Sequence, residues 1–184
     1  VGTATDLCLH PRKHSAAAIH VYRLFDNRLV LLHKTEVEDV PKSLAELKGF
    51  GRLLAGMGHS LRMYDLGKKK LLKKCENRNL PNLIVGMQTM GDRIYVSDVL
   101  DSVHFVKYRR AENALVVFAD DTSPRTVTAC CTVDYDTIAG GDKFGNLFLL
   151  RLPEKVSDDV DNPTGNRVLW DTGRLNGAPN KVEV

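Results

Sequence analysis

The sequence predicts an all-β protein made of the four-stranded antiparallel sheets of a β-propeller, and three observations lead to this expectation. A short apolar segment with an aromatic or basic residue recurs at spacings of 42, 43 and 43 residues, beginning at Val21, Met63, Val106 and Leu149. Propeller blades of the WD type repeat about every 40–45 residues. Short apolar runs joined by tight turns surround each copy, and no long stretch shows the 3.6-residue period of a helix.

The strands around these copies can be assigned in chain order. Residues 26–27 form a turn after the first copy, and residues 29–32 resume a strand. Residues 67–70 and 110–113 form the corresponding turns of the next two copies. The strand before each later copy is an apolar run that ends in small or polar residues: 52–56, 93–98 and 137–142. The best helix candidate, residues 40–47, is short and lies where a strand is due, so we expect almost no helix.

These assignments divide the chain into a partial blade, two complete blades, a second partial blade and a polar connection. In this order the segments cover residues 18–35, 43–75, 84–118, 126–152 and 153–181. The first supplies the last two strands of its blade, and the fourth supplies three strands. About four blade equivalents are the lower limit for a closed propeller, and the chain starts and stops inside blades. We therefore expect a fragment of a larger propeller.

Composition and charge narrow the class of protein. Apolar residues make up 43% and charged residues 27% of the chain, which is typical of a globular domain. The formal net charge of +3 is too small to indicate nucleic-acid or anionic-membrane binding by itself. There is no apolar run of transmembrane length and no signal peptide, so we expect no membrane partner. The four cysteines lack Cys-x-x-Cys spacing, which favours free thiols in a reducing compartment such as the nucleus or cytosol.

Some residues resemble parts of a catalytic site or a metal site, but the sequence around each of them does not support that chemistry. Glycosidase-like chemistry needs two carboxylates converging in a cleft, whereas aspartates in blade turns usually accept backbone hydrogen bonds. His10 and His14 have a zinc-ligand spacing, but Pro11 breaks the helix that would align them. The acidic run at 158–161 lacks the glycine and the final glutamate of a calcium loop. Since no glycine-rich phosphate loop precedes a helix either, we expect no enzymatic activity, no metal and no cofactor.

Three features are candidates for binding a partner protein. The first is a basic run, which we expect to stay exposed: Lys68, Lys69, Lys70, Lys73 and Lys74. The second is the acidic part of the long connection: Asp158, Asp159 and Asp161. The third is Trp170, the only tryptophan, which we expect to be substantially buried on the propeller flank or under a partner.

Two interpretations of the basic run stay open. It is either a solvated hairpin that keeps an outer strand soluble, or a contact to an acidic protein surface or to RNA phosphate. No aromatic residues alternate with the lysines, so nothing indicates base stacking.

Long runs of the sequence resemble one family. The runs follow one another in order along the chain: residues 64–77, 96–99, 118–122, 134–137, 142–146, 161–166, 169–171 and 175–178. The most telling are Asp-Lys-Phe-Gly-Asn at 142–146 and Asp-Asn-Pro-Thr-Gly-Asn at 161–166. In these runs the chain resembles the family of subunit 3 of the splicing factor 3b complex. The wider superfamily of triple-propeller scaffolds includes the damage-specific DNA-binding adaptor of a ubiquitin ligase and the large subunit of the cleavage and polyadenylation complex.

The resemblance implies a place in the last of three seven-bladed propellers, without catalytic residues. It implies a nuclear scaffold of the spliceosome that acts in pre-mRNA splicing, in the particle that recognises the intron branch site. The implied partners are the other subunits of the splicing factor 3b complex, chiefly a HEAT-repeat solenoid and a small subunit, with indirect contact to RNA.

Two alternatives to this function stay open at this point. The same fold could serve as an adaptor for ubiquitin ligation or for RNA 3′-end cleavage and polyadenylation, although the runs at 142–146 and 161–166 favour the splicing family. An enzyme that uses the central channel of a propeller is the other alternative, and no convergent set of residues supports it.

Overall fold

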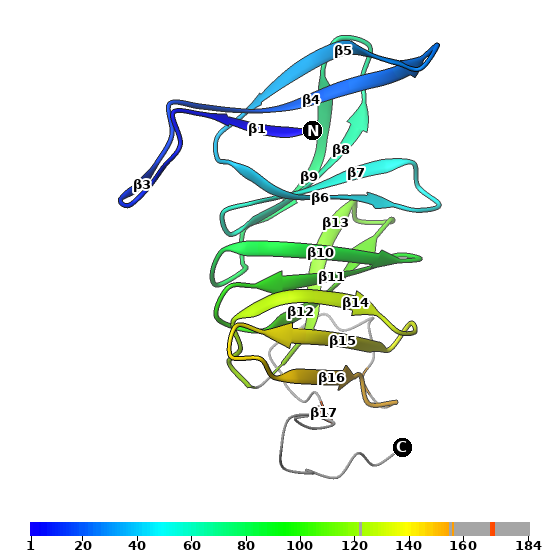
Figure 1. Cartoon of the computed structure of the whole chain (residues 1–184). Helices are drawn as coiled ribbons and strands as arrows, with labels where there is room; N and C mark the ends of the chain where they lie inside the picture. Colours follow the sequence, from blue (N-terminus) through cyan, green and yellow to red (C-terminus); the bar gives the residue numbers. More distant parts are fainter. Residues whose placement is uncertain (122, 155, 157–169, 172–184) are drawn as a thin grey trace.

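The computed structural model describes residues 1–121, 123–154, 156 and 170–171, and each regular element in this part of the chain is a β-strand. Four antiparallel sheets follow one another through the molecule in chain order, from the N-terminal sheet to the sheet that contains β17 (Figure 1). The predicted all-β class is therefore confirmed, and the sheets are those of propeller blades. The described part contains no helix that is long and apolar enough to cross a membrane.

The first sheet has three strands in the order β1-β4-β5, with bounds Gly2–Thr5, Ala16–Phe25 and Arg28–Val37. The sequence indicated β4 and β5 but not β1, whose residues pair with Ala16 to Ile19. Between β1 and β4 the chain forms a small hairpin of β2 (Cys8–Leu9) and β3 (Arg12–Lys13), which projects from the stack of sheets (Figure 1).

The second and third sheets each have four strands in sequential order. The second contains β6 (Pro41–Leu47), β7 (Arg52–Met57), β8 (Ser60–Leu66) and β9 (Leu71–Asn77). The third contains β10 (Ile84–Met90), β11 (Arg93–Asp98), β12 (Val103–Arg109) and β13 (Ala114–Asp120). The short helix candidate at 40–47 is therefore strand β6. Its proline stands at the first residue of the strand, where a missing N–H is tolerated.

The fourth sheet takes its outermost strand from a distant part of the chain. Its strands are β14 (Val127–Thr132), β15 (Thr137–Asp142), β16 (Leu147–Arg151) and β17 (Trp170–Asp171). In β17, Trp170 pairs with Arg151 and Asp171 pairs with Leu150. The sequence analysis assigned three strands here and placed residues 170–171 in the connection. Two residues are too few for a periodic pattern, so only the pairing partner reveals this strand.

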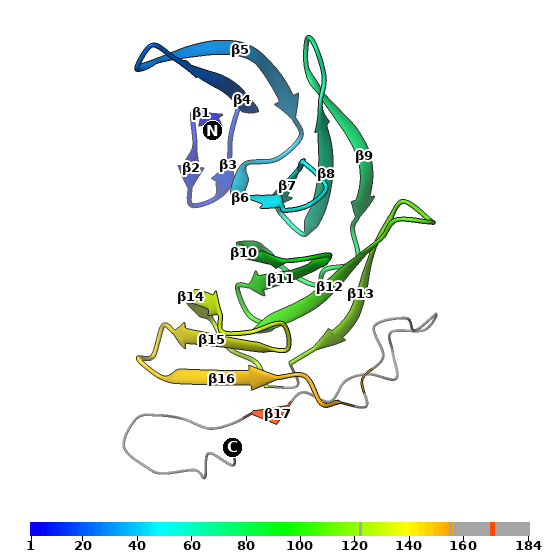
Figure 2. The same cartoon turned by 90° about the vertical axis from the view of Figure 1, so that its right-hand side faces the viewer.

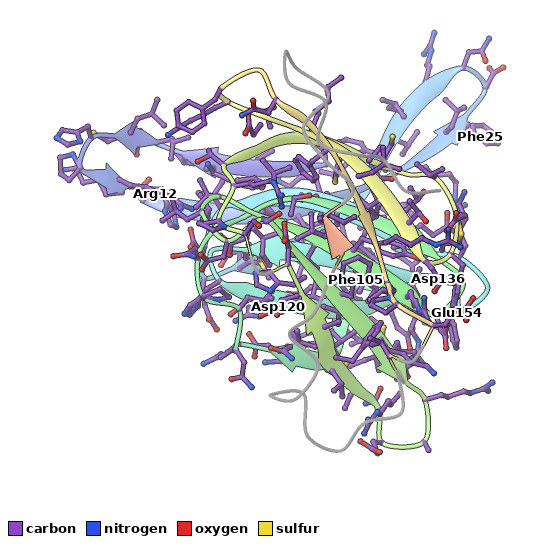
Figure 3. The ribbon with its side chains drawn as sticks, turned by 90° about the horizontal axis from the view of Figure 1, so that it is seen from below. Arg12, Phe25, Phe105, Asp120, Asp136 and Glu154 are labelled. Carbon is purple, nitrogen blue, oxygen red and sulfur yellow. The ribbon has the colours of Figure 1, made fainter. Side chains whose placement is uncertain are left out.

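The hydrophobic core lies between successive sheets. Ile19 of the first sheet belongs to one buried cluster with Tyr64 and Leu71 of the second. Larger buried clusters join the second sheet to the third and the third to the fourth. Phe105, which belongs to the last of these, lies in the middle of the molecule in Figure 3. Gly140 is needed in this cluster because an added Cβ would lie 2.3 Å from the Phe148 ring.

The hairpins β4–β5 and β8–β9 have the same register, displaced by 42 residues. Leu24 opposes Leu29 in the first hairpin, as Leu66 opposes Leu71 in the second. Each pair of strands is interrupted by a bulge at the same place, after Val21 in β4 and after its counterpart in β8. The predicted repeat is therefore present at the level of individual strand pairs.

Candidate protein-interaction surfaces

The lysines of the β8–β9 turn are exposed, as the sequence predicted. Lys68, Lys69 and Lys70 form the turn itself, and Lys73 and Lys74 follow on β9. The Lys73 ammonium lies 3.3 Å from Glu76, and the Lys74 ammonium lies 3.1 Å from Asp65. Among the described residues, no ion pair is formed by the three lysines of the turn. They therefore present uncompensated positive charge to solvent.

The other two predicted features fall on residues that the structure does not describe fully. Asp158, Asp159 and Asp161 lie outside the described residues, and their role in binding stays a prediction. For Trp170 the backbone is described as part of β17, opposite Arg151, but the burial of its side chain is not. The expectation that Trp170 is buried is therefore untested.

Aspartates near the strand ends accept hydrogen bonds inside the fold. Asp121 accepts a hydrogen bond from the Ser102 hydroxyl at 2.6 Å and forms an ion pair with Arg125. Asp134 accepts from the backbone N–H of Asp136 at 2.8 Å. These contacts satisfy the polar groups of turns, which is the role that the sequence analysis favoured for aspartates in the blades.

A cluster of charged residues lies where the β7–β8 turn meets the segments before β6 and after β9. Arg62 is buried and donates hydrogen bonds to Glu76 and, at 2.6 Å, to Glu38. Arg78 also reaches Glu76, at 3.1 Å. Glu38, Arg62 and Arg78 line a cavity of about 240 Å³ that His59 also borders. Sequence reasoning missed the cluster because its members come from separate elements and form no motif.

Electrostatics keep the carboxylates of this cluster ionised. Burial acts to raise the pKa of Glu76, but hydrogen bonds from Arg62 and Arg78 outweigh it and lower the pKa to about 2. The hydrogen bond from Arg62 likewise lowers the pKa of Glu38 below its usual value. The two carboxylates keep the buried Arg62 guanidinium paired, and an unpaired charge at this position would destabilise the fold.

The innermost strands β6, β10 and β14 lie side by side along one edge of the stack (Figure 2). A cavity of about 280 Å³ opens between β10 and β14, where the Ser97 hydroxyl lies 2.8 Å from the Cys130 thiol. Burial raises the pKa of Cys130, so this thiol stays protonated near neutral pH and is a poor nucleophile. Within the described residues, no three His, Cys, Asp or Glu side chains are grouped to hold a metal ion.

The β4–β5 hairpin carries an exposed apolar surface that the sequence analysis did not single out. Phe25 and Leu24 are each 69% exposed, and the neighbouring strand adds exposed side chains from Leu29 to Leu32. Figure 3 shows Phe25 on the projecting hairpin, away from the body of the sheets. A signal was available in the sequence: four consecutive apolar residues on a strand place apolar side chains on both faces.

Comparison with known proteins finds a family match and similarity to proteins named as splicing factors. The model of the family described as CPSF A subunit region matches residues 1–180. Splicing factor 3B subunit 3 of Danio rerio is 54% identical over 187 aligned residues, which cover all of this chain and 15% of that protein. Probable splicing factor 3B subunit 3 of Dictyostelium discoideum and Spliceosome-associated protein 130 A of Arabidopsis thaliana are 50% and 52% identical, with the same coverage.

The chain thus spans about one seventh of the length of these relatives. Its repeat of about 43 residues and its successive four-stranded sheets lie within the matched region. The chain belongs to the family of the CPSF A subunit region.

Proposed function

We propose that this chain is part of a non-enzymatic protein-binding scaffold of the spliceosome, a component of the splicing factor 3b complex that acts in pre-mRNA splicing in the nucleus. The observation that carries the proposal is identity of 50% or more, over the whole chain, to proteins named as splicing factor 3B subunit 3 in an animal and in an amoeba. Adaptors for ubiquitin ligation or RNA 3′-end processing, the alternatives, belong to the same wider superfamily. The relatives reported above, however, are named as splicing factors.

Three features of the described residues support a binding role over catalysis. The aspartates described above accept hydrogen bonds within turns, the half-buried Cys130 thiol has a raised pKa, and lysines and apolar side chains are exposed on the hairpins. Since stacked sheets bury their alternating apolar residues in the core, recognition is left to turns, hairpins and connections.

The proposed partners are the other subunits of the splicing factor 3b complex, in particular a HEAT-repeat solenoid and a small subunit. We assign partner contacts to the lysines at 68–70 and 73–74, and to Asp158, Asp159, Asp161 and Trp170 of the long connection. RNA contact would be indirect, because the lysine turn lacks aromatic residues for base stacking.

Affinity purification from nuclear extract tests this proposal. The full-length protein that contains this chain is tagged at its natural locus, and the recovered proteins are identified by mass spectrometry. Splicing factor 3b subunits should be recovered in near-equal amounts with the bait. Recovery of ubiquitin-ligase or cleavage and polyadenylation subunits in their place would refute the proposal.

A further inference from the structure

Near the tip of the β4–β5 hairpin, one face carries mainly apolar side chains. Residues that oppose one another in an antiparallel pair lie on the same face, and neighbours along a strand alternate. Tyr22 opposes Leu31, and Leu24 opposes Leu29, so these four side chains share one face. All four are exposed. Four exposed apolar side chains in one patch are unusual for a surface in water and mark an interaction site.

The other face of the same hairpin combines apolar and basic groups. Arg23 opposes Val30, and Phe25 opposes Arg28. Neither arginine forms an ion pair with any residue in the described part of the chain. This face therefore offers two free cations next to two exposed apolar side chains.

Packing of one sheet on the next explains only part of this exposure. The residues 42 positions after Tyr22 and Leu29 are Tyr64 and Leu71, which are 4% and 5% exposed because the first sheet covers them. A sheet packed in front of the first one would cover Tyr22 and Leu29 in the same way. The exposure of Tyr22 and Leu29 is therefore no evidence for a separate partner protein.

The remaining apolar positions have counterparts that stay exposed even where a preceding sheet is present. Leu66, the counterpart of Leu24, is 65% exposed, and Leu72, the counterpart of Val30, is also exposed. The counterparts of Leu31 and Leu32 are the exposed Lys73 and Lys74. The hairpin thus exposes apolar side chains at four positions whose counterparts are exposed leucines or lysines, which the preceding sheet leaves uncovered: Leu24, Val30, Leu31 and Leu32.

The lysine turn lies beside the base of this apolar hairpin. The backbone N–H of Leu71 donates a hydrogen bond to the Thr35 hydroxyl at 2.9 Å, which ties the start of β9 to β5. Lys68, Lys69 and Lys70 directly precede Leu71, and both hairpins extend toward the same end of the molecule (Figures 1 and 2). The result is an apolar patch with free cations on the hairpin and next to its base.

We propose that the β4–β5 hairpin and the adjacent lysine turn together dock one acidic, apolar polypeptide segment of a partner protein. Its apolar side chains would cover Leu24 and Leu31, and its carboxylates would pair with the lysine turn. A second copy of this chain does not fit, since the same basic groups would face one another. The inference rests on the proposed function, which supplies the partner protein, and adds the surface and the chemistry of the segment.

Site-specific cross-linking in the full-length protein, in its own cells, tests the occupant. Photoreactive benzoylphenylalanine replaces Leu24 or Leu31, and in a control it replaces the exposed Leu100 of the β11–β12 turn. Leu24 and Leu31 should both cross-link to one segment of one partner protein, rich in Asp, Glu and apolar residues, and Leu100 should not. Cross-links within the same polypeptide, to a second copy, to RNA or to nothing would overturn the inference.

Matched variants test the energetics. Leu24→Ser with Leu31→Ser should lower recovery of that partner about tenfold, which corresponds to about 1.4 kcal/mol. Lys68→Glu, Lys69→Glu and Lys70→Glu together should lower it as well, whereas Leu100→Ser should not. Since all these side chains are exposed, the melting temperature should stay unchanged in each variant.

The outcomes separate this inference from the proposed function. If the unmodified protein recovers no splicing factor 3b subunit, the proposed function fails, and the cross-links from Leu24 still decide whether an acidic, apolar segment occupies the hairpin. If the unmodified protein recovers these subunits and the Leu24→Ser, Leu31→Ser variant recovers them equally, only the docking inference fails.

Discussion

The guanidinium of Arg93 lies 3.9 Å from the centroid of the Tyr135 ring, and this contact joins the third sheet to the fourth. Arg93 also donates hydrogen bonds to the Tyr135 carbonyl at 2.9 Å and to Asp136 at 2.5 Å. The Tyr135 hydroxyl in turn donates to Asp92 at 2.6 Å. The paired residues lie 42 or 43 positions apart, so one repeat is fastened to the next by reciprocal polar contacts.

Arg93→Met should destabilise the fold by about 2–3 kcal/mol, because it removes charge-assisted hydrogen bonds and a cation–π contact from a buried site. Urea unfolding followed by circular dichroism measures this. The matched control is Arg110→Met in the exposed β12–β13 turn, which should change stability by less than about 0.5 kcal/mol. Equal midpoints for both variants would show that the contact between sheets contributes nothing.

His104 should make the protein less stable in mild acid. Burial lowers the pKa of His104 below its usual value of 6.5, although Asp98 and Asp120 oppose the shift. The unfolded chain therefore takes up the proton first, and stability falls as the pH drops below about 6.5. Urea midpoints at pH 7.5 and 5.5 should show this fall, and His104→Asn should make it smaller. The exposed His59, changed to Asn, should keep the wild-type slope; equal slopes in all three proteins would exclude His104 as the cause.

Glu76 should stabilise the fold at neutral pH and lose this effect in acid. Hydrogen bonds from Arg62 and Arg78 overcome the effect of burial and lower the pKa of Glu76 to about 2, from an ordinary value of 4.5. A group with a lowered folded-state pKa contributes stability above pH 4.5, and this contribution disappears as the pH falls toward 2. The difference in unfolding free energy between wild type and Glu76→Gln should therefore shrink between pH 6 and pH 3. A constant difference would contradict the ion-pair assignment.

Replacing Lys68, Lys69 and Lys70 together by Ala should leave folding intact, because exposed charges contribute little to stability. Thermal melts should agree with wild type to within about 0.5 kcal/mol. Recovery of splicing factor 3b subunits should weaken, more at low salt than at high salt, because screening already reduces the contribution of the lysines at high salt. The same three residues changed to Arg keep the charge and should bind normally. Equal recovery of the Ala and wild-type proteins at low salt would assign the lysines to solubility alone.

Trp170 is expected from the sequence to be substantially buried. If Trp170 is a core residue, Trp170→Ala should lower the unfolding free energy by about 3–5 kcal/mol, measured by thermal or urea unfolding. If Trp170 is instead an interface residue, the Trp170→Ala variant would keep its stability but recover less of the partner in pull-downs. Trp170→Phe should retain most of either property. A Trp170→Ala protein unchanged in both assays would show that the connection around residue 170 has no role in folding or binding.

Several features could be predicted from the sequence because they depend on local chemistry. The spacing of Val21, Met63 and Val106 indicated the repeat, and these residues lie on β4, β8 and β12. The turn at 26–27 followed from Asp and Asn, which tolerate the positive φ angles of 48° and 55° that a tight hairpin requires. Exposure of the lysine turn followed from the cost of burying charge.

The tertiary structure decided which residues meet across sheets. Arg93 joins Tyr135 because the third and fourth sheets, one repeat apart, stack with a particular register. Arg62 meets Glu76 through the pairing of β8 with β9, and it meets Glu38 because the chain before β6 passes the same end of that sheet. The strand at 170–171 is likewise defined by its pairing with β16.

The exposed β4–β5 hairpin shows the same difference between what the local sequence determines and what the tertiary structure decides. Its residues 29–32 are as apolar as those of a core strand, and their composition indicates burial. Their exposure becomes clear only when the hairpin is compared with β8–β9, where the first sheet covers Tyr64 and Leu71 but leaves Leu66 in solvent. Local sequence fixes hydrophobicity and strand period, whereas burial depends on which neighbouring sheet or partner lies within contact distance.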